Sequence, residues 1–366
     1  MLLSFLLQFI PLVSAAVLYR RQQVNENPTV GGDPYNGWQT LPQVTDATLY
    51  PDWTVDQKSG AKIPVYQTKG LENSYIKRAV IVLSGKNRDC WYYWNVMNNA
   101  LYNASYHDPE IRREDISIIG PCFFAEADRN SGAITDDILQ WRTTTWIDGK
   151  ANVSPSYHKV SSFDVLDALV SYYMNTTTFP NLKAVVVGGH SAGGQMAQRY
   201  AMLRKTTEDE DRLHFWVANP GSLCWLTEGR PRPDNSCSNA DQYKYGLGDG
   251  FPAYATSETS RLGRNGLVSR YNGRNMHYAW GTVRFPFITD NGPGDTSCKA
   301  FTQGRTHLER GRNFVSMLED LPGGIPTPTT VDWIEGVSHS NEDMMSSAAG
   351  IDKVASLDGP SHCCTN

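Results

Sequence analysis

Residues 184–195 constrain the fold more than any other part of the chain. They read Ala-Val-Val-Val-Gly-Gly-His-Ser-Ala-Gly-Gly-Gln, and good helix formers follow up to Arg204. A run of β-branched residues that changes abruptly into a glycine-rich turn and a helix is typical of a buried parallel strand leading into a crossover helix. Gly189 and Gly193 would let the turn close without a clash of Cβ atoms. The segment predicts an α/β fold with Ser191 at the carboxyl edge of a sheet.

Ser191 is the candidate nucleophile, because Gly-x-Ser-x-Gly between a strand and a helix is the pattern of a nucleophile elbow. A serine hydroxyl is a weak nucleophile until a neighbouring imidazole takes its proton. The backbone N–H of Ala192 would stabilise the negative charge that develops on a substrate oxygen. A glycine-rich turn of purely structural purpose is the alternative interpretation.

Strand and helix patterns alternate along the chain, which predicts a mostly parallel sheet with helices on both faces. Apolar runs predict strands at residues 79–85, 116–120, 183–188, 213–219, 276–281 and 331–337, and helical patterns cover residues 90–101 and 162–173. The periodicity lapses between residues 220 and 275. Because long loops in compact domains are usually lids or binding elements, we expect a lid insertion at about 221–275, over the sheet edge where such folds bind ligands.

The other members of a catalytic triad follow the serine in the order acid, then histidine, in a sheet of this kind. His339 stands in a small polar loop after the last predicted strand and is the candidate general base. The acid should lie in the loop after the penultimate strand. Asp290 is the first candidate, because Asp-Asn-Gly begins a turn, and Asp295 is the alternative. We expect His190 to be a structural or pocket residue, and ordinary packing roles for His158, His214, His277 and His307.

The second N–H group of an oxyanion hole should come from the loop after strand 79–84. By position, the backbone N–H of Lys86 is the natural donor. The side chains of Lys86 and Arg88 are expected to be solvated surface charges.

The amino-terminal segment predicts export. The first sixteen residues are mostly apolar, are interrupted by Pro11, and end in the small residues Ser14, Ala15 and Ala16, as in a signal peptide cleaved after residue 16. An uncleaved membrane anchor is the alternative, because Arg20-Arg21 follow the apolar run. Glycosylation sequons occur at Asn103, Asn152 and Asn175. Seven cysteines are compatible with disulfides in an oxidising compartment, and Cys224 and Cys237 are close enough in sequence to staple one surface loop.

Charge and cysteine spacing argue against several functional classes. The net charge of −5 provides no basic surface for nucleic acid. The sequence has no Cys-x-x-Cys pair and no His-x-x-x-His pattern that would suggest a metal site. We therefore expect no metal and no cofactor.

Over residues 60–350 the chain resembles a family of secreted fungal and bacterial α/β-hydrolase-fold proteins, which are serine hydrolases similar to esterases. The resemblance rests on the segments Leu-Ser-Gly-Lys-Asn-Arg-Asp (83–89), Phe179-Pro-Asn-Leu with the following Gly-His-Ser-Ala-Gly-Gly-Gln, Asn219-Pro-Gly-Ser, Gly294-Asp-Thr-Ser-Cys-Lys-Ala and Gln303-Gly-Arg-Thr-His-Leu-Glu-Arg-Gly. It implies that residues 17–366 form an α/β-hydrolase domain with a lid. Two positions differ from the pattern of the family. Ser84-Gly85 replaces His-Gly in the oxyanion loop, and Arg284 stands where an aspartate is usual, so that Asp290 follows only after the apolar insertion 284–289.

The leading hypothesis is a secreted serine hydrolase that cleaves a carboxylic ester, small or lipid-like, through an acyl-enzyme on Ser191. A second hypothesis is a catalytically weak protein of the same fold that acts as a binding or steering factor, for example in metabolite biosynthesis. A third is a membrane-anchored hydrolase, which we do not favour. Aromatic residues of the lid segment are expected to serve lid packing more than recognition of an apolar acyl group; they are Trp225, Tyr243, Tyr245 and Tyr254.

Overall fold

The computed structural model describes residues 24–283 and 294–355. The expected signal peptide 1–16, Asp290, and the cysteines Cys363 and Cys364 lie outside the described residues.

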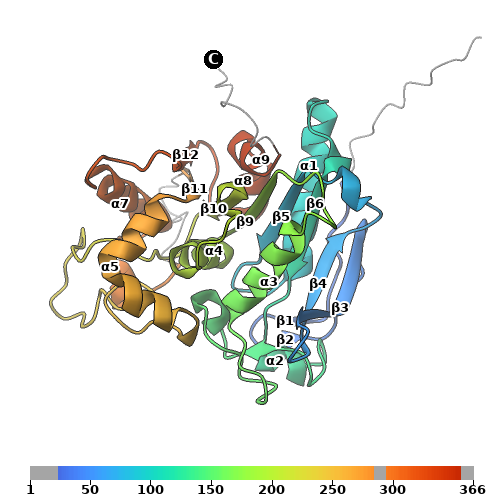
Figure 1. Cartoon of the computed structure of the whole chain (residues 1–366), viewed down its shortest axis with the longest axis horizontal. Helices are drawn as coiled ribbons and strands as arrows, with labels where there is room; N and C mark the ends of the chain where they lie inside the picture. Colours follow the sequence, from blue (N-terminus) through green and yellow to red (C-terminus); the bar gives the residue numbers. More distant parts are fainter. Residues whose placement is uncertain (1–23, 284–293, 356–366) are drawn as a thin grey trace, which may run out of the picture.

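Within the described residues, eight strands form one sheet in the order β12-β11-β10-β9-β5-β6-β4-β3 (Figure 1). They are β3 (Ala47–Asp56), β4 (Ala61–Thr68), β5 (Arg78–Leu83), β6 (Ile116–Pro121), β9 (Ala184–His190), β10 (Leu213–Ala218), β11 (Asn275–Gly281) and β12 (Thr330–Ile334). Strand β4 runs antiparallel to both of its neighbours, and the other pairs are parallel. The predicted mostly parallel sheet is confirmed. Two short ribbons lie apart from it; their strands are β1 (Gly32–Asp33) with β2 (Gly37–Trp38), and β7 (Phe124–Ala125) with β8 (Gln140–Trp141).

Helices cover both faces of the sheet (Figure 1). The α-helices are α1 (Cys90–His107), α2 (Glu126–Asn130), α3 (Ser162–Met174), α4 (Ala192–Leu203), α5 (Thr256–Asn272), α6 (Cys298–Phe301), α7 (His307–Glu319), α8 (Asn341–Ser346) and α9 (Ala348–Ala355). Single 3-10 turns are η1 (Asn73–Tyr75), η2 (Arg113–Asp115), η3 (Thr145–Asp148), η4 (Glu210–Arg212) and η5 (Ala253–Ala255). Helices α3, α4, α5 and α7 contribute to one hydrophobic core, and α1, α8 and α9 to the other.

Strand β9 shows how the apolar run creates both cores. All of its residues are buried. Because successive side chains of a strand point to opposite faces, Val185 and Val187 belong to the core under α4, while Val186 belongs to the core under α1. The sequence of a strand that is buried on both faces therefore shows a continuous run of apolar residues rather than an alternation of apolar and polar residues.

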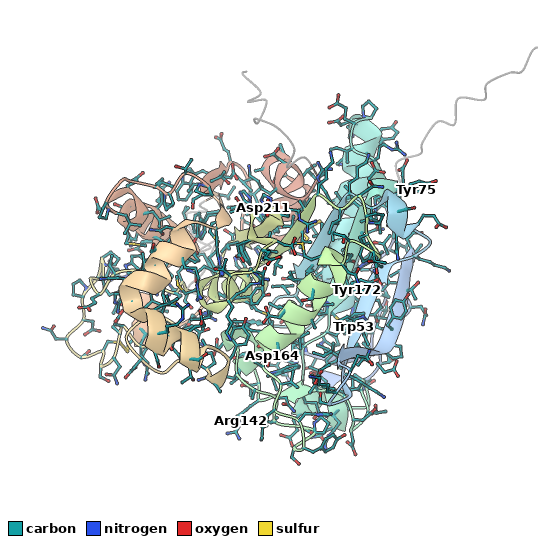
Figure 2. All side chains as sticks on the ribbon, in the orientation of Figure 1. Trp53, Tyr75, Arg142, Asp164, Tyr172 and Asp211 are labelled. Atoms are coloured by element: carbon teal, nitrogen blue, oxygen red, sulfur yellow. A yellow bond between two sulfur atoms is a disulfide. The ribbon has the colours of Figure 1, made fainter. Side chains whose placement is uncertain are left out.

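Several elements were not predicted from the sequence. Strand β3 is at the edge of the sheet and is mostly half-buried or exposed, so its pattern is weak. Helix α3 covers part of it, with the rings of Trp53 and Tyr172 packed edge to face at 6.3 Å (Figure 2).

Helix α5, which was also not predicted, occupies the end of the expected lid segment. It buries only Leu267 and Tyr271, and Gly263 interrupts it with a positive φ, which explains why its helical periodicity is hard to see.

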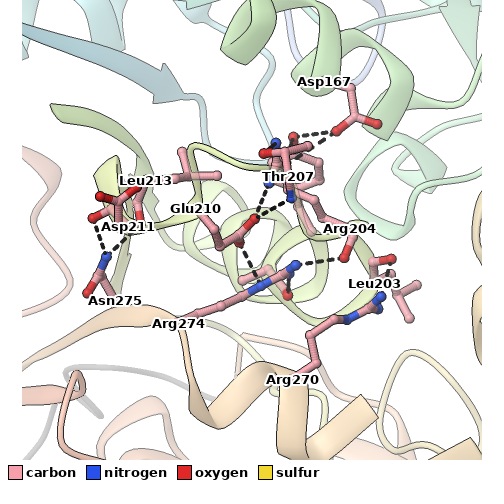
Figure 3. Close-up of polar contacts among 12 residues, drawn as sticks. Asp167, Leu203, Arg204, Thr207, Glu210, Asp211, Leu213, Arg270, Arg274 and Asn275 are labelled. Atoms are coloured by element: carbon pink, nitrogen blue, oxygen red, sulfur yellow. Dashed lines mark hydrogen bonds and ion pairs between the residues drawn. The ribbon is translucent and has the colours of Figure 1, made fainter. Parts of the chain in front are cut away.

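A buried ion cluster fastens the carboxyl end of α4 to the turn before β11 (Figure 3). Glu210 accepts a hydrogen bond from Arg204 at 2.5 Å and pairs with Arg274 at 2.9 Å. The Arg274 guanidinium also donates to the backbone oxygen of Arg204 at 2.7 Å. These contacts hold α4 rigidly on the sheet, and the turn at its start carries Ser191.

Two disulfides occur in the described residues, Cys90–Cys122 and Cys237–Cys298. The first joins the start of α1 to the residue after β6. The second joins the long loop after β10 to the start of α6. The expected disulfide between Cys224 and Cys237 is wrong, because Cys237 is bonded to Cys298 and Cys224 is a buried free thiol. Proximity in sequence did not decide the pairing.

No helix in residues 24–283 or 294–355 combines the length and hydropathy needed to cross a bilayer.

The imidazole of His277, in β11, should make the stability of the protein depend on pH. Its nitrogens lie 3.0 Å from His214 Nδ1 and 2.9 Å from Thr330 Oγ1. Burial, with the neighbouring His214 and Lys353, lowers the pKa of His277 to about 3. A histidine with a lowered folded-state pKa contributes stability above its unfolded-state pKa of about 6.5, and loses it as the pH falls.

Replacing His277 with glutamine should therefore destabilise the protein less at acidic pH. Between pH 7.5 and pH 5 the difference in the free energy of unfolding between wild type and His277→Gln should shrink by about 2 kcal/mol. Urea denaturation at each pH measures this difference. His107→Gln is the matched control, because it removes an imidazole from the surface rather than from the core. A difference that stays constant across this range would contradict the prediction.

Candidate active site

Ser191 lies in a strained turn between β9 and α4. Its backbone has φ 60° and ψ −116°. A residue with a Cβ atom rarely adopts such a conformation, at a cost of about 1–3 kcal/mol. Its N–H donates to the oxygen of Ala218 at 2.9 Å and so ties the turn to β10. The predicted strand, turn and helix are confirmed, and the strain is concentrated at the serine.

The two glycines of the motif allow α4 to approach the sheet. A Cβ atom at Gly189 would lie 2.4 Å from the backbone oxygen of Leu83, and one at Gly193 would lie 2.3 Å from the same oxygen. Backbone atoms of β5 cannot move away as a flexible side chain would. Only glycine fits at these two positions.

The loop after β5 lies against the start of α4, as an oxyanion hole requires. Ala192 is the first residue of α4, and Lys86 belongs to the facing loop. The side chain of Lys86 is exposed, as expected. The expectation for Arg88 is wrong, because its side chain is buried and donates to the carboxylate of Asp128 at 2.6 and 3.0 Å. This ion pair anchors the loop that carries the Lys86 N–H.

A buried asparagine connects the strand ends to the histidine loop. The side-chain amide of Asn219 donates to the oxygen of Ser338 at 3.1 Å and lies 3.3 Å from His190 Nε2. Its side-chain oxygen accepts from the N–H of Gly281 at 3.1 Å. Asn219 thus joins the ends of β9, β10 and β11 to the residue before His339. The sequence motif contained Asn219 but gave no indication of this role.

His339 lies between two other imidazoles. Its ring centroid is 4.3 Å from that of His190 and 4.1 Å from that of His307. His190 directly precedes Ser191, so this contact brings the two predicted catalytic segments together. Burial, helped by His307, His190 and Lys86, lowers the pKa of His339 far below its usual range. Burial also lowers the pKa of His190 to about 3. The expected packing role of His307 turns out to be a contact with the candidate base.

The structure describes only one of the two candidate acids. Asp290 lies outside the described residues. Asp295 accepts hydrogen bonds from the Tyr245 hydroxyl at 2.7 Å, the Ser297 N–H at 3.0 Å and the Ser222 hydroxyl at 3.2 Å. Burial acts to raise the pKa of Asp295, but the hydrogen bonds from Ser297 and Tyr245, with the charge of Lys244, outweigh it and lower this pKa. Among the described residues, Nδ1 of His339 has no hydrogen-bond partner.

The aromatic residues of the loop after β10 mainly support packing. Trp225 and Tyr243 are buried, and the Trp225 ring packs edge to face on Phe314 at 5.4 Å. Tyr245 is also buried and holds Asp295. A cavity of about 310 Å³ lies between this loop and the carboxyl half of α7, and Trp225 lines it. None of its lining residues belongs to the segments that carry Ser191 or His339.

The sequons differ in accessibility. The Asn152 side chain is buried and fully engaged, since it donates to the oxygen of Pro155 at 2.9 Å and accepts from the N–H of Val160 at 2.9 Å. The folded protein therefore does not present Asn152 for glycosylation. Asn175 is exposed at the end of α3, and Asn103 is half-buried in α1.

Comparison with solved structures agrees with this topology. A poly(3-hydroxybutyrate) depolymerase from Bordetella parapertussis is similar, with a TM-score of 0.52 and 17% identity over 83% of this chain and 88% of that chain. A poly(aspartic acid) hydrolase-1 from Sphingomonas sp. KT-1 has a TM-score of 0.53 and 18% identity over 83% of this chain and 96% of that chain. Neither the protein-family models nor the curated protein sequences gave a match.

The chain has the α/β-hydrolase fold.

In the α/β-hydrolase order, the triad residues come from three successive segments of the chain. Ser191 follows β9, the connection after β11 contains Asp290 and Asp295, and His339 follows β12. Because these strands are parallel, the three segments leave the same edge of the sheet.

Proposed function

We propose that the chain is a secreted serine hydrolase that cleaves a carboxylic ester through an acyl-enzyme on Ser191. The observation that carries the proposal is the strained turn at the half-buried Ser191, which follows His190, whose ring contacts that of His339. Strain of this kind persists in a protein when the surrounding structure enforces it, and it is concentrated at functional sites. The fold supports the same interpretation.

In the acylation step, Nε2 of neutral His339 takes the proton of Ser191 as Oγ attacks the ester carbonyl carbon. The N–H groups of Ala192 and Lys86 hold the oxyanion of the tetrahedral intermediate. Its collapse breaks the carbon–oxygen bond to the alcohol, and His339 returns the proton to the leaving oxygen. A water molecule then gives a proton to His339 and attacks the acyl carbon. The bond from this carbon to Ser191 Oγ breaks, His339 returns the proton to Oγ, and the acid is released.

The triad acid orients His339 and stabilises its protonated form. Asp290 is our first assignment, and Asp295 is the alternative. The hydrogen bonds that Asp295 makes to Tyr245 and Ser222 favour Asp290, because they already satisfy the carboxylate.

The proposed substrate is a small or lipid-like ester, and the mechanism uses no metal, cofactor or nucleic acid. We also propose that residues 1–16 are a signal peptide and that export brings the chain to an oxidising compartment. The disulfides Cys90–Cys122 and Cys237–Cys298 support this location. Asn103 and Asn175 are the proposed glycosylation sites. Membrane anchoring is not favoured.

One observation supports the second candidate function, a catalytically weak binding or steering protein. The carboxylate of Asp295 is engaged by Tyr245 and Ser222, and His339 Nδ1 has no hydrogen-bond partner within the described residues. Without an acid, a triad loses most of its rate enhancement.

Covalent labelling with a fluorophosphonate separates the two functions. The hydrolase should become labelled at Ser191, and mass spectrometry of peptides identifies the modified residue. The Ser191→Ala variant should not react. If wild type is not labelled at Ser191 and turns over no ester, the binding protein becomes the better explanation.

A further inference from the structure

In the segment formed by Ser191 and helix α4, two residues are accessible to solvent. Of residues 191–203, all described, Ser191 and Gln195 are half-buried and every other residue is buried. The N–H of Gln195 donates to the oxygen of Ser191 at 3.0 Å, so the two are one helical turn apart. Residues at this spacing share a face of the helix, with Cβ atoms about 5–6 Å apart. Gln195 is therefore the half-buried neighbour of Ser191 on this face of the helix.

The side-chain oxygen of Gln195 is already occupied. Oε1 accepts from Arg199 Nη2 at 2.8 Å and lies 2.9 Å from the Ser222 hydroxyl. A guanidinium can only donate, so the atom that faces it must be the oxygen of the amide and not the nitrogen. Arg199 is itself buried and fixed by the carboxylate of Asp148 at 2.9 Å. The orientation of the Gln195 amide is therefore determined by the fold.

The amide nitrogen of Gln195 points to a space that a missing side chain leaves open. A Cβ atom at Gly221 would lie 2.8 Å from Nε2 of Gln195. Glycine at this position allows the –NH₂ group to sit there, beside the loop that carries Asp295. The result is a fixed neutral donor against Gly221, on a residue one helical turn from Ser191.

We infer that Gln195 is a specificity-determining residue, whose –NH₂ group donates a hydrogen bond to a second oxygen of the substrate close to the scissile ester. The inference rests on the proposed ester hydrolysis and names the substrate class more narrowly. A neutral donor suits a neutral acceptor, such as an ether, hydroxyl or carbonyl oxygen. The preferred substrate is thus an ester with another oxygen a few bonds from the reacting carbonyl, rather than a plain hydrocarbon ester.

Pairs of esters that differ by one oxygen in place of a CH₂ group test the inference. For the acid part, p-nitrophenyl methoxyacetate is compared with the butyrate, and the 3-methoxypropionate with the pentanoate. For the alcohol part, 2-methoxyethyl butyrate is compared with butyl butyrate by titration of the released acid. The ratio of kcat/KM within each pair is measured in wild type, Gln195→Glu and Gln195→Met. Comparing ratios between proteins cancels the intrinsic reactivity of the esters.

In at least one pair, the preference for the oxygen-containing ester should fall about five- to tenfold in both variants, the size of one hydrogen bond. Gln195→Glu keeps an oxygen that accepts from Arg199 but has no N–H group to donate to the substrate. It therefore tests recognition of the substrate oxygen while the contact with Arg199 is retained. The pair that responds shows whether the oxygen belongs to the acid or to the alcohol. Gly221→Ala, which places a methyl group against Nε2, should lower the same ratio.

Gln242→Glu is the matched control, because Gln242 also accepts from a cation, Lys299 Nζ at 2.8 Å, in the loop after β10. Its ratios should equal those of wild type. Unchanged ratios in every Gln195 variant, in enzymes that hydrolyse esters and label at Ser191, would overturn this inference and leave the proposed function standing. A wild type that neither hydrolyses the esters nor becomes labelled would overturn both.

Discussion

Replacing Ser191 with alanine should lower kcat for ester hydrolysis by about 10⁴-fold or more. Without the hydroxyl no acyl-enzyme forms, and only the oxyanion donors and substrate binding contribute to the residual rate. Alanine has the same backbone requirements as serine in this turn, so the fold should be retained. Steady-state kinetics with p-nitrophenyl butyrate measures the effect.

The exposed Ser260, on α5, provides the control for this substitution. Ser260→Ala should have the kcat of wild type, and thermal unfolding should show that both variants are folded. Turnover by Ser191→Ala at more than about one-hundredth of the wild-type rate would contradict the assignment of the nucleophile.

Replacing Asp290 with asparagine should lower kcat by up to about 10⁴-fold, because an amide favours the wrong tautomer of His339. Asp295→Asn should cost much less activity, since that carboxylate already binds Tyr245 and Ser222. The pH profile adds a second measurement. A carboxylate beside His339 raises the pKa of the imidazole, so its removal should move the acid limb of kcat/KM to lower pH. Asp295→Asn should leave that limb in place.

Other outcomes would reassign the acid. The opposite ranking of the two variants would give the role to Asp295. If neither substitution matters while Ser191→Ala abolishes turnover, the protein acts through a serine–histidine dyad.

The sequence predicted the features that depend on local order along the chain. The apolar run of β9, the glycines and the helix formers of α4 are contiguous, so their pattern indicated the turn at Ser191 directly. The position of His339 followed from the strand before it. Helix α5 was missed because few of its residues are buried and Gly263 interrupts it. Strand β3 was missed because an exposed edge strand lacks a strong apolar pattern.

Contacts between distant segments could not be predicted in this way. The ion pair between Arg88 and Asp128, the bond from Asn219 to the histidine loop and the Cys237–Cys298 disulfide each join residues far apart in sequence. Nothing in the local pattern around Arg88 distinguishes a buried cation from a solvated one. The role of Arg88 becomes clear only in the folded structure, where Asp128 lies next to it.

The Cys237–Cys298 bond has a practical consequence for how the protein must be produced. It closes a segment of 61 residues that includes Tyr245 and Asp295. In the chain-entropy model, a cross-link over such a segment stabilises the folded state by about 4 kcal/mol. A reducing bacterial cytosol would leave this disulfide unformed, and protein made there would differ from the oxidised protein in the loop that holds Asp295. Expression under oxidising conditions is therefore needed to obtain the protein with this bond in place.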